Sequence, residues 1–198
     1  HVRHLYDDLN YYFLTTDQGP GLRVTTLPEV TAQPDHVVRT YQDYAIHEKE
    51  DHNLIKSGKQ WFGERFDIIK RYDLPTVSFP DLDLTAEVKV RASVVGRSTS
   101  LSSFRIVVDG VQVMTPFVPP VPPGGYNNDY ARQTVESGSL YPLSTNISTT
   151  VYYDPIVTGS IGWLDYIEYN VWRNMAFRGG QLRLRNASVI GPTTVSSF

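Results

Sequence analysis

Apolar and polar residues alternate along most of the chain, and this period of two is typical of β-strands. The alternation is clearest over 84–96, where every second residue from Val88 to Val94 is apolar and those between are polar. The segments on either side of Asp109-Gly110 are expected to form a hairpin, because this dipeptide suits a two-residue turn. Further strands are expected over 11–16, 22–27, 36–48, 75–79, 102–110, 111–117, 129–136, 147–154, 162–172 and 181–190, the first two as another hairpin.

Helix is expected in one place only, near residues 48–56. Leu54 and Ile55 are apolar there, and Gly58 is placed to end the helix. Many short strands with one short helix are typical of an all-β fold, an antiparallel β-sandwich or jelly roll. No linker-like stretch divides the chain, so we predict a single β-sandwich domain over 1–198. The chain starts without Met, and we interpret it as a fragment of a longer protein.

The composition narrows the range of functions. The formal net charge is −3 and no basic block occurs, so nucleic acid is not an expected partner. No apolar run approaches the roughly 20 residues of a membrane helix, so no transmembrane segment is expected. The chain has no cysteine, which excludes disulfides, thiolate metal sites and a cysteine nucleophile within it.

The stretch from His47-Glu48 to His52 looks at first like the zinc-binding helix of a metalloprotease. Such a helix needs its two histidines four residues apart, so that both project from one face. His47 and His52 are five apart, which turns them about 140° from one another on a helix. We therefore expect neither a zinc site nor catalytic residues in this stretch.

Acidic residues offer two other kinds of chemistry. Asp81 and Asp83 fall on one side of an extended chain, which makes them candidate calcium ligands. Calcium takes six or more oxygens, so solvated turn residues are the alternative interpretation. Pairs such as Glu64 with Asp67 could serve a glycosidase only if a cleft held both carboxylates at a fixed distance.

The expected strand 162–172 carries large residues on both faces. Strict alternation places Trp163, Asp165 and Ile167 on one face and Leu164 and Tyr166 on the other. A strand of this kind is buried on one side and partly covered on the other. We therefore expect something beyond its own sandwich to pack on it.

Two stretches, IHEKEDHNLIKSGKQWFGERFD (46–67) and GWLDYIEYNVWRNM (162–175), resemble the region upstream of the protease domain in PorU-type proteins. These are the sortases, or C-terminal signal peptidases, of the type IX secretion system in Bacteroidetes, and they are gingipain-like cysteine peptidases. The N-terminal YYFLTTDQGPGLRV (11–24) is similar as well. The matching residues are His47, Glu48, Asn53, Leu54, Ser57, Gly58, Trp61, Phe62, Gly63, Glu64, Trp163, Leu164, Asp165 and Tyr166.

The resemblance implies a non-catalytic β-sandwich that precedes the protease domain of its parent protein. The nucleophile of the family is a cysteine, which this chain lacks. The implied partners are the adjacent protease domain and other type IX secretion components, the implied location is the outer membrane or cell surface, and no cofactor is implied. The expected interdomain contacts are His47, Glu48, Asn53, Ser57, Gly58, Trp61, Phe62, Gly63, Glu64, Trp163 and Asp165. We expect the adjacent aromatic side chains of Trp61 and Phe62 to lie across a groove or sheet edge.

Two alternatives remain open at the level of sequence. A carbohydrate-binding jelly-roll module of a surface or exported protein would show exposed Trp and Tyr clustered on a shallow sheet. An enzyme with carboxylate chemistry would show acidic residues that converge in a pocket. The positions of Trp61, Trp163 and Trp172 separate these possibilities.

Overall fold

The computed structural model describes residues 19–26, 31–122, 129–180, 183–191 and 195–197. Its compact unit spans Pro34–Phe198, and His1–Gln33 form a separate unit. Within this N-terminal unit, residues 19–26 and 31–33 contain no strand. The first strand of the predicted N-terminal hairpin, 11–16, lies outside the described residues, and 22–26 do not form the second. The prediction of one domain over 1–198 stays a prediction.

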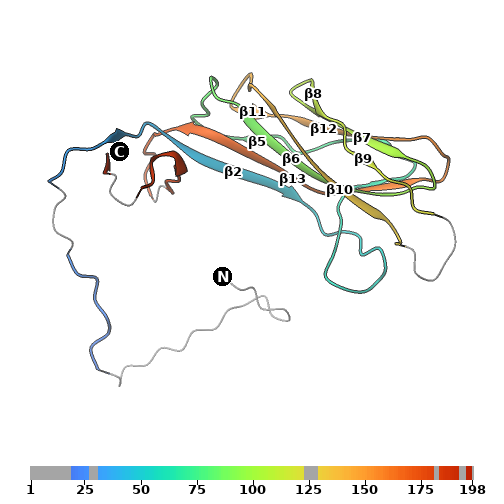
Figure 1. Cartoon of the computed structure of the whole chain (residues 1–198), viewed down its shortest axis with the longest axis horizontal. Coiled ribbons are helices and arrows are strands. Elements are labelled where there is room, and N and C mark those ends of the chain that lie inside the picture. Colours follow the sequence, from blue (N-terminus) through green and yellow to red (C-terminus); the bar gives the residue numbers. More distant parts are fainter. Residues whose placement is uncertain (1–18, 27–30, 123–128, 181–182, 192–194, 198) are drawn as a thin grey trace. The chain divides into compact units, whose positions relative to one another are not determined.

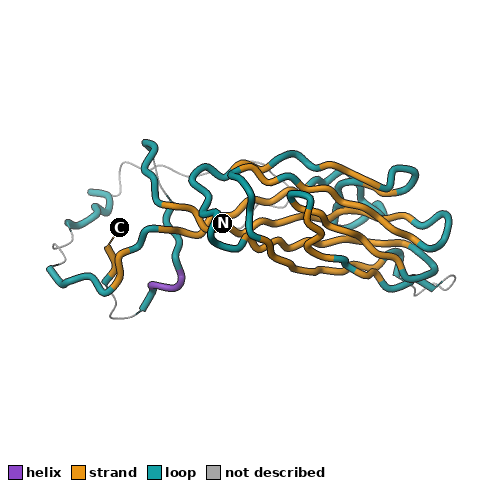
Figure 2. The backbone as a smooth tube through the Cα atoms, turned by 90° about the horizontal axis from the view of Figure 1, so that it is seen from above, coloured by secondary structure: helices purple, strands orange, loops and turns teal. Residues whose placement is uncertain are grey.

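The compact unit is a sandwich of two antiparallel sheets (Figures 1 and 2). Sheet I has the order β10 (Arg132–Leu140), β6 (Val88–Arg97), β13 (Ile161–Asn174) and β2 (Thr40–Glu48), with β3 (Arg65–Phe66) also paired to β13. Sheet II has the order β4 (Arg71–Asp73), β12 (Thr149–Pro155), β7 (Ser102–Val108) and β8 (Val111–Met114), with β9 (Phe117–Val118) also paired to β7. The prediction of an all-β sandwich is confirmed.

Short elements complete the unit. Strand β5 (Val77–Ser78) pairs with β11 (Asn146–Ile147), and β1 (His36–Val37) pairs in parallel with β14 (Ser196–Ser197). The one helix among the described residues is the 3-10 turn η1 (Ala187–Val189). No helix in this part of the chain has the length and apolar character that membrane crossing requires.

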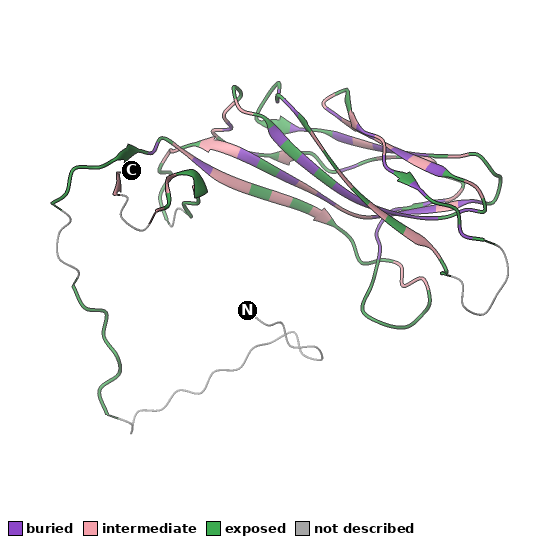
Figure 3. Cartoon of the chain, viewed as in Figure 1, coloured by how far each residue is buried: buried purple, intermediate pink, exposed green. Residues whose placement is uncertain are grey.

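The core lies between the two sheets and follows the period-two pattern of the sequence. Buried residues alternate with more exposed ones along the strands, and on β7 every second residue is buried while those between are of intermediate exposure (Figure 3). Aromatic rings fill the middle, where the ring centroids of Phe104 and Tyr153 lie 4.7 Å apart. Gly162 lies under these rings, because a Cβ at this position would come within 2.6 Å of Phe104 Cζ. The two sheets therefore approach closely at Gly162.

The predicted turn at Asp109-Gly110 is confirmed. Both residues have positive φ, 47° and 80°, and Val108 pairs directly with Val111. Positive φ at both central residues is the requirement of the hairpin turn that matches the twist of the strands.

Two local predictions are wrong. Residues 48–56 form no helix, because β2 runs to Glu48 and His52 then pairs with Phe62 as an antiparallel bridge. A nine-residue helix is too short to be stable without packing. The pairing of His52 with Phe62 stabilises this segment more than a helix would. The strand expected over 181–190 is also absent from its described part, which contains η1 with Asn186 as its N-cap.

Candidate functional site

The expected interdomain contact residues gather at one end of sheet I. They lie mainly on the 49–64 loop, which joins β2 to β3. His52 and Phe62 exchange backbone hydrogen bonds of 2.9 Å, and Gly63 N–H donates to Leu164 O at 2.7 Å. The amide of Leu164 donates in turn to Glu64 O at 3.0 Å. Main-chain hydrogen bonds therefore fix the loop against β13.

A small apolar cluster lies beneath this loop, on the outer face of sheet I. Phe62, Val95 and Trp163 are its buried members, and Trp163 is only 4% exposed. Val95 projects away from the sandwich core, since its neighbour Val94 belongs to that core and successive strand residues face opposite sides. The loop thus covers this end of the outer face.

Trp163 reaches the outer face because β13 contains a β-bulge. The register of β13 shifts between Leu164 and Tyr166, which leaves Asp165 as an extra residue. Leu164 and Ile167 consequently both belong to the core between the sheets, while Trp163 packs under the loop. The prediction that Trp163 and Ile167 share one face is therefore wrong.

Glu64 is a buried carboxylate within the site, with its side chain 4% exposed. Its Oε1 lies 3.0 Å from His47 Nε2 and 2.8 Å from Lys49 Nζ. Burial alone raises the pKa of a carboxyl group, but the hydrogen bonds from His47 and Lys49 outweigh burial and lower the pKa of Glu64 to about 2. The same contact raises the pKa of Lys49. The second oxygen, Oε2, is buried without a hydrogen-bond partner among the described residues.

Gly63 allows the loop to lie this close to its neighbours. A Cβ on Gly63 would meet Lys49 Cβ at 3.0 Å and Leu164 O at 3.4 Å. The first distance is tighter than an ordinary van der Waals contact, so a side chain here would push the loop away from β2 and β13. The glycine of the Trp-Phe-Gly-Glu sequence therefore has a steric role.

Asn53, Ser57 and Gly58 shape the tip of the loop. Asn53 Oδ1 accepts the amide hydrogen of Ser57 at 2.9 Å, and Asn53 Nδ2 donates to Gly58 O at 3.4 Å. Lys56 and Gly58 have positive φ, 55° and 80°. These local hydrogen bonds replace the helix that the sequence had indicated.

A shallow hollow of about 310 Å³ opens between the loop tip and the adjoining ends of β6 and β10. Its apolar wall comes from Leu54, Phe62 and Val95 together with Tyr130, and Gln133 stands at its polar rim. The lining is completed by Ile55, Ser57, Gly58, Lys59, Gln60, Asp129 and Ala131. The sequence did not indicate the contributions of β6 and β10, because three distant segments meet only in the folded chain.

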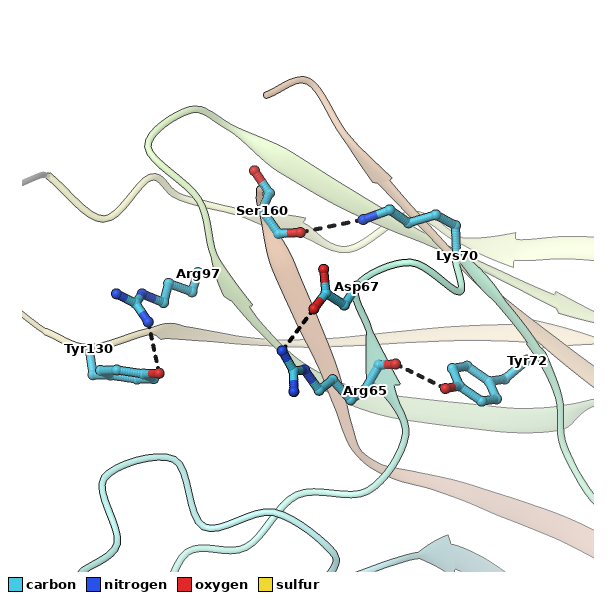
Figure 4. A network of polar contacts seen from close by, with 7 residues as sticks. All are labelled: Arg65, Asp67, Lys70, Tyr72, Arg97, Tyr130 and Ser160. Atoms are coloured by element: carbon cyan, nitrogen blue, oxygen red, sulfur yellow. Dashed lines mark hydrogen bonds and ion pairs between the residues drawn. The ribbon is translucent and has the colours of Figure 1, made fainter. Parts of the chain in front are cut away.

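Polar contacts hold the rim in place. Arg97 Nη1 donates to the Tyr130 hydroxyl at 2.8 Å, and its guanidinium lies 4.3 Å from the ring centroid (Figure 4). Gln133 Nε2 donates to Asp165 Oδ2 at 2.8 Å, which connects the rim to the bulge of β13. Tyr130 is therefore presented in a fixed position.

The segment after the loop is anchored separately. Arg65 pairs with Asp67 at 2.8 Å, the Tyr72 hydroxyl donates to Arg65 O at 2.9 Å, and Lys70 Nζ donates to Ser160 O at 3.3 Å (Figure 4). Asp67 thus has a different cationic partner from Glu64. These two carboxylates are engaged in separate ion pairs.

Four of the expected contact residues are exposed, namely Glu48, Ser57, Gly58 and Trp61. Trp61 is 44% exposed at the base of the loop, although its neighbour Phe62 is 7% exposed. Glu48, at the end of β2, is also exposed. The site thus combines a rigid buried layer with an exposed aromatic side chain, a geometry suited to binding a surface.

Asp81 and Asp83 lie away from the loop and have protein partners. Both oxygens of Asp81 accept hydrogen bonds from Arg178, at 2.7 and 2.9 Å. Asp83 Oδ1 accepts from the amide and the hydroxyl of Thr85. In the part of the chain that the structure describes, no group of three His, Asp or Glu side chains is placed to hold a metal ion.

Comparison with known proteins shows the fold alone. No family model matches the chain, and the curated proteins contain no significant match. A crystal structure of dimeric latent PorU from Porphyromonas gingivalis has a TM-score of 0.65 and 17% identity, and the match covers 80% of this chain and 15% of that one. The carbohydrate-binding module CBM36 in complex with calcium and xylotriose has a TM-score of 0.38 and 10% identity, over 63% of this chain and 98% of that one. The CBM36-1 domain of a multidomain xylanase from the hindgut metagenome of Trinervitermes trinervoides has a TM-score of 0.39 and 9% identity, and the match covers 64% of this chain and 96% of that one. At the level of fold, this chain contains a PorU-like β-domain.

Proposed function

We propose that this chain is a non-catalytic accessory domain of a type IX secretion sortase, a C-terminal signal peptidase, and that it packs against the cysteine-protease domain of its parent protein. The observation that carries the proposal is the assembly of the 49–64 loop and the bulged end of β13 into one fixed surface. The fold shared with PorU supports the same assignment. The absence of cysteine removes the thiolate that the chemistry of such a parent requires.

The surface has the properties of a docking site. Trp61 is exposed, and the neighbouring hollow has an apolar wall. Tryptophan is enriched among the residues that dominate binding energy at interfaces, especially beside preformed pockets. The buried contacts of Glu64 and Phe62 hold this surface rigid, so little ordering entropy is lost on binding.

The proposal includes a parent protein and a location. The parent is a gingipain-like cysteine peptidase, exported and held at the outer membrane or cell surface. The docked domain orients or covers the protease domain. Other type IX secretion components are further partners in this proposal.

The experiment is a binding titration between the chain and the protease domain of the parent protein, expressed separately. Trp61→Ala should weaken binding by about tenfold or more, as expected for an interface hot spot. Phe117→Ala is the matched control, since Phe117 is an exposed aromatic on sheet II. Equal weakening by both variants, or no binding by the unaltered chain, would overturn the proposal.

A second candidate function is carbohydrate binding, and one observation favours it. Tyr44 and Trp172 line a common hollow of about 170 Å³ on the outer face of sheet I, together with the amides Gln42 and Asn170. Aromatic faces and amide groups are chemically suited to a sugar ring and its hydroxyls. The three tryptophans do not form one platform, because Trp163 is buried and lies about 30 Å along β13 from Trp172. Titration with neutral oligosaccharides, compared between the chain and Trp172→Ala, tests this candidate.

A further inference from the structure

Three loops meet at the end of the sandwich where β6 ends and β13 begins. The last residue of β6, Arg97, pairs with Ile161 at the start of β13. Pro155 at the end of β12 pairs with Ser102 at the start of β7, and β3 pairs with the first part of β13. The loops that follow or precede these strand ends are called the end loops here, and they are 67–70, 98–101 and 156–160.

Hydrogen bonds join the end loops to one another through Ser160, which is buried. Ser160 Oγ lies 2.9 Å from Ser98 Oγ. Ser160 O accepts a hydrogen bond from Lys70 Nζ at 3.3 Å (Figure 4). Lys70 O in turn accepts from the amide of Tyr153 at 2.9 Å. The end loops are therefore connected parts of one surface.

This surface carries exposed aliphatic side chains. Ile68 is 95% exposed and Ile156 is 74% exposed, and Ile69, Leu101 and Val157 are exposed as well. Single exposed apolar residues are ordinary, but several on adjoining loops mark a contact with a protein or a membrane.

The charges of the end loops distinguish between these two partners. Their only ionisable side chains are Asp67 and Lys70. Asp67 is paired with Arg65 at 2.8 Å, whereas Lys70 lies 5.0 Å from the ring centroid of Tyr153, a neutral partner. Arg97, at the end of β6, also has a neutral partner, a tyrosine hydroxyl and ring (Figure 4). Two positive charges at this end are therefore left to attract an anionic surface.

The opposite end of the sandwich has the reverse character. Its loops 79–87, 109–110 and 141–145 contain no lysine or arginine. They contain four acidic residues, Asp81, Asp83, Glu87 and Asp109. Arg178 pairs with Asp81, but no loop at that end supplies a cation of its own. Leu143 is 77% exposed there, so the two ends differ in charge more than in aliphatic exposure.

We propose that the end loops bind an anionic lipid surface, with Ile68 and Ile156 inserted among the lipids. Protein interfaces depend mostly on Trp, Tyr and Arg and little on Leu, Val, Ser and Thr. The end loops contain none of the first group and several of the second, which favours lipid over a protein partner. Insertion is limited to side chains, because the backbone groups of a loop cannot be left unpaired in hydrocarbon.

This inference goes beyond the proposed function, since it concerns a contact with lipid and requires no protease domain. Its tests use the chain alone with vesicles, whereas the docking titration contains no lipid. Failure of one therefore leaves the other standing.

Insertion can be tested with a single cysteine, because the chain has none of its own. Ile156→Cys, labelled with an environment-sensitive nitrobenzoxadiazole dye, should brighten and shift to the blue when vesicles of phosphatidylcholine and phosphatidylglycerol are added. Leu143→Cys, labelled in the same way at the opposite end, is the matched control and should not respond. A dye at position 156 that stays in water, or an equal response at both positions, would overturn the proposal and favour a protein as the partner of these loops.

The contribution of the aliphatic side chains can be measured by co-sedimentation with the same vesicles. The double variant Ile68→Ser/Ile156→Ser should lower the partition coefficient by about tenfold or more, because two apolar side chains no longer leave water. Leu143→Ser should change it by less than about twofold. Circular dichroism verifies that each variant is folded. Absence of vesicle binding by the unaltered chain, or equal loss in both variants, would overturn the proposal.

Discussion

His47 Nε2 lies 3.0 Å from Glu64 Oε1. This contact joins the C-terminal end of β2 to the end of the 49–64 loop. Lys49 reaches the same oxygen, so one buried carboxylate receives two donors, His47 from β2 and Lys49 from the start of the loop. A buried charge is stable only when it is paired and hydrogen-bonded. The position of the loop therefore depends on this contact as well as on the apolar cluster.

Glu64 should make stability depend on pH in the acid range. Its pKa is about 2 in the folded chain against an ordinary value of 4.5, so the stabilisation is complete above pH 4.5 and is lost as pH falls toward 2. The difference corresponds to about 3 kcal/mol. Glu64→Gln should lower the free energy of unfolding by this order at pH 7, and the two proteins should converge near pH 2. Denaturant unfolding across this pH range measures the effect.

Asp67→Asn is the matched control for that experiment. Asp67 also pairs with a cation, but its side chain is 42% exposed, and exposed ion pairs contribute between about 0 and 1 kcal/mol. If Glu64→Gln retained the same acid sensitivity as the unaltered chain, the assigned role of Glu64 would be wrong.

The adjacent aromatics Trp61 and Phe62 should differ in their effect on stability. Phe62 is 7% exposed within the apolar cluster, so Phe62→Ala should cost about 3 kcal/mol or more. Trp61 is 44% exposed, so Trp61→Ala should cost less than about 1 kcal/mol. Urea denaturation of the two variants checks this order. A core-sized loss for Trp61→Ala would place its ring within the packing of this domain and would remove the argument for docking.

The regular parts of the fold could be predicted from the sequence because local patterns decide them. Alternation identified most strands of the sandwich, and the need for positive φ identified the Asp109-Gly110 turn. The false helix at 48–56 had a different origin. The composition of residues 48–56 permits a helix. The structure instead pairs His52 with Phe62, and no local sequence pattern indicates a contact between residues so far apart.

The candidate site could be predicted only as a set of residues and not as an arrangement. The bulge at Asp165 is hidden in the sequence, since both faces of β13 carry large side chains and a change of face leaves no trace. Val95 offered a weak signal, because it directly follows Val94 and so places an apolar residue on the outer face. The hollow depends on three separate segments and required the folded structure.

Glycine substitutions should show where the chain has no room for a side chain. Gly162→Ala would place a Cβ within 2.6 Å of Phe104 Cζ and 3.1 Å of Tyr153, so it should cost about 1 to 3 kcal/mol through overpacking. Gly63→Ala should cost less, since its nearest contact is 3.0 Å to Lys49 Cβ. Thermal unfolding of both variants gives the order. Gly21→Ala is the control, because no atom lies within 4 Å of its Cβ position and its stability should be unchanged.

The isolated chain should have no peptidase activity. A cysteine peptidase needs a thiolate to attack the carbonyl carbon, and the chain contains no cysteine. The assay is cleavage of type IX C-terminal signal peptides by the purified chain, followed by mass spectrometry. Iodoacetamide, which alkylates cysteine, is the control. The chain has no cysteine for it to alkylate, so any activity that iodoacetamide abolishes belongs to a contaminating protease. Turnover that persists after alkylation and repeated purification, and that increases with the concentration of the chain, would contradict the prediction and the non-catalytic role proposed for this domain.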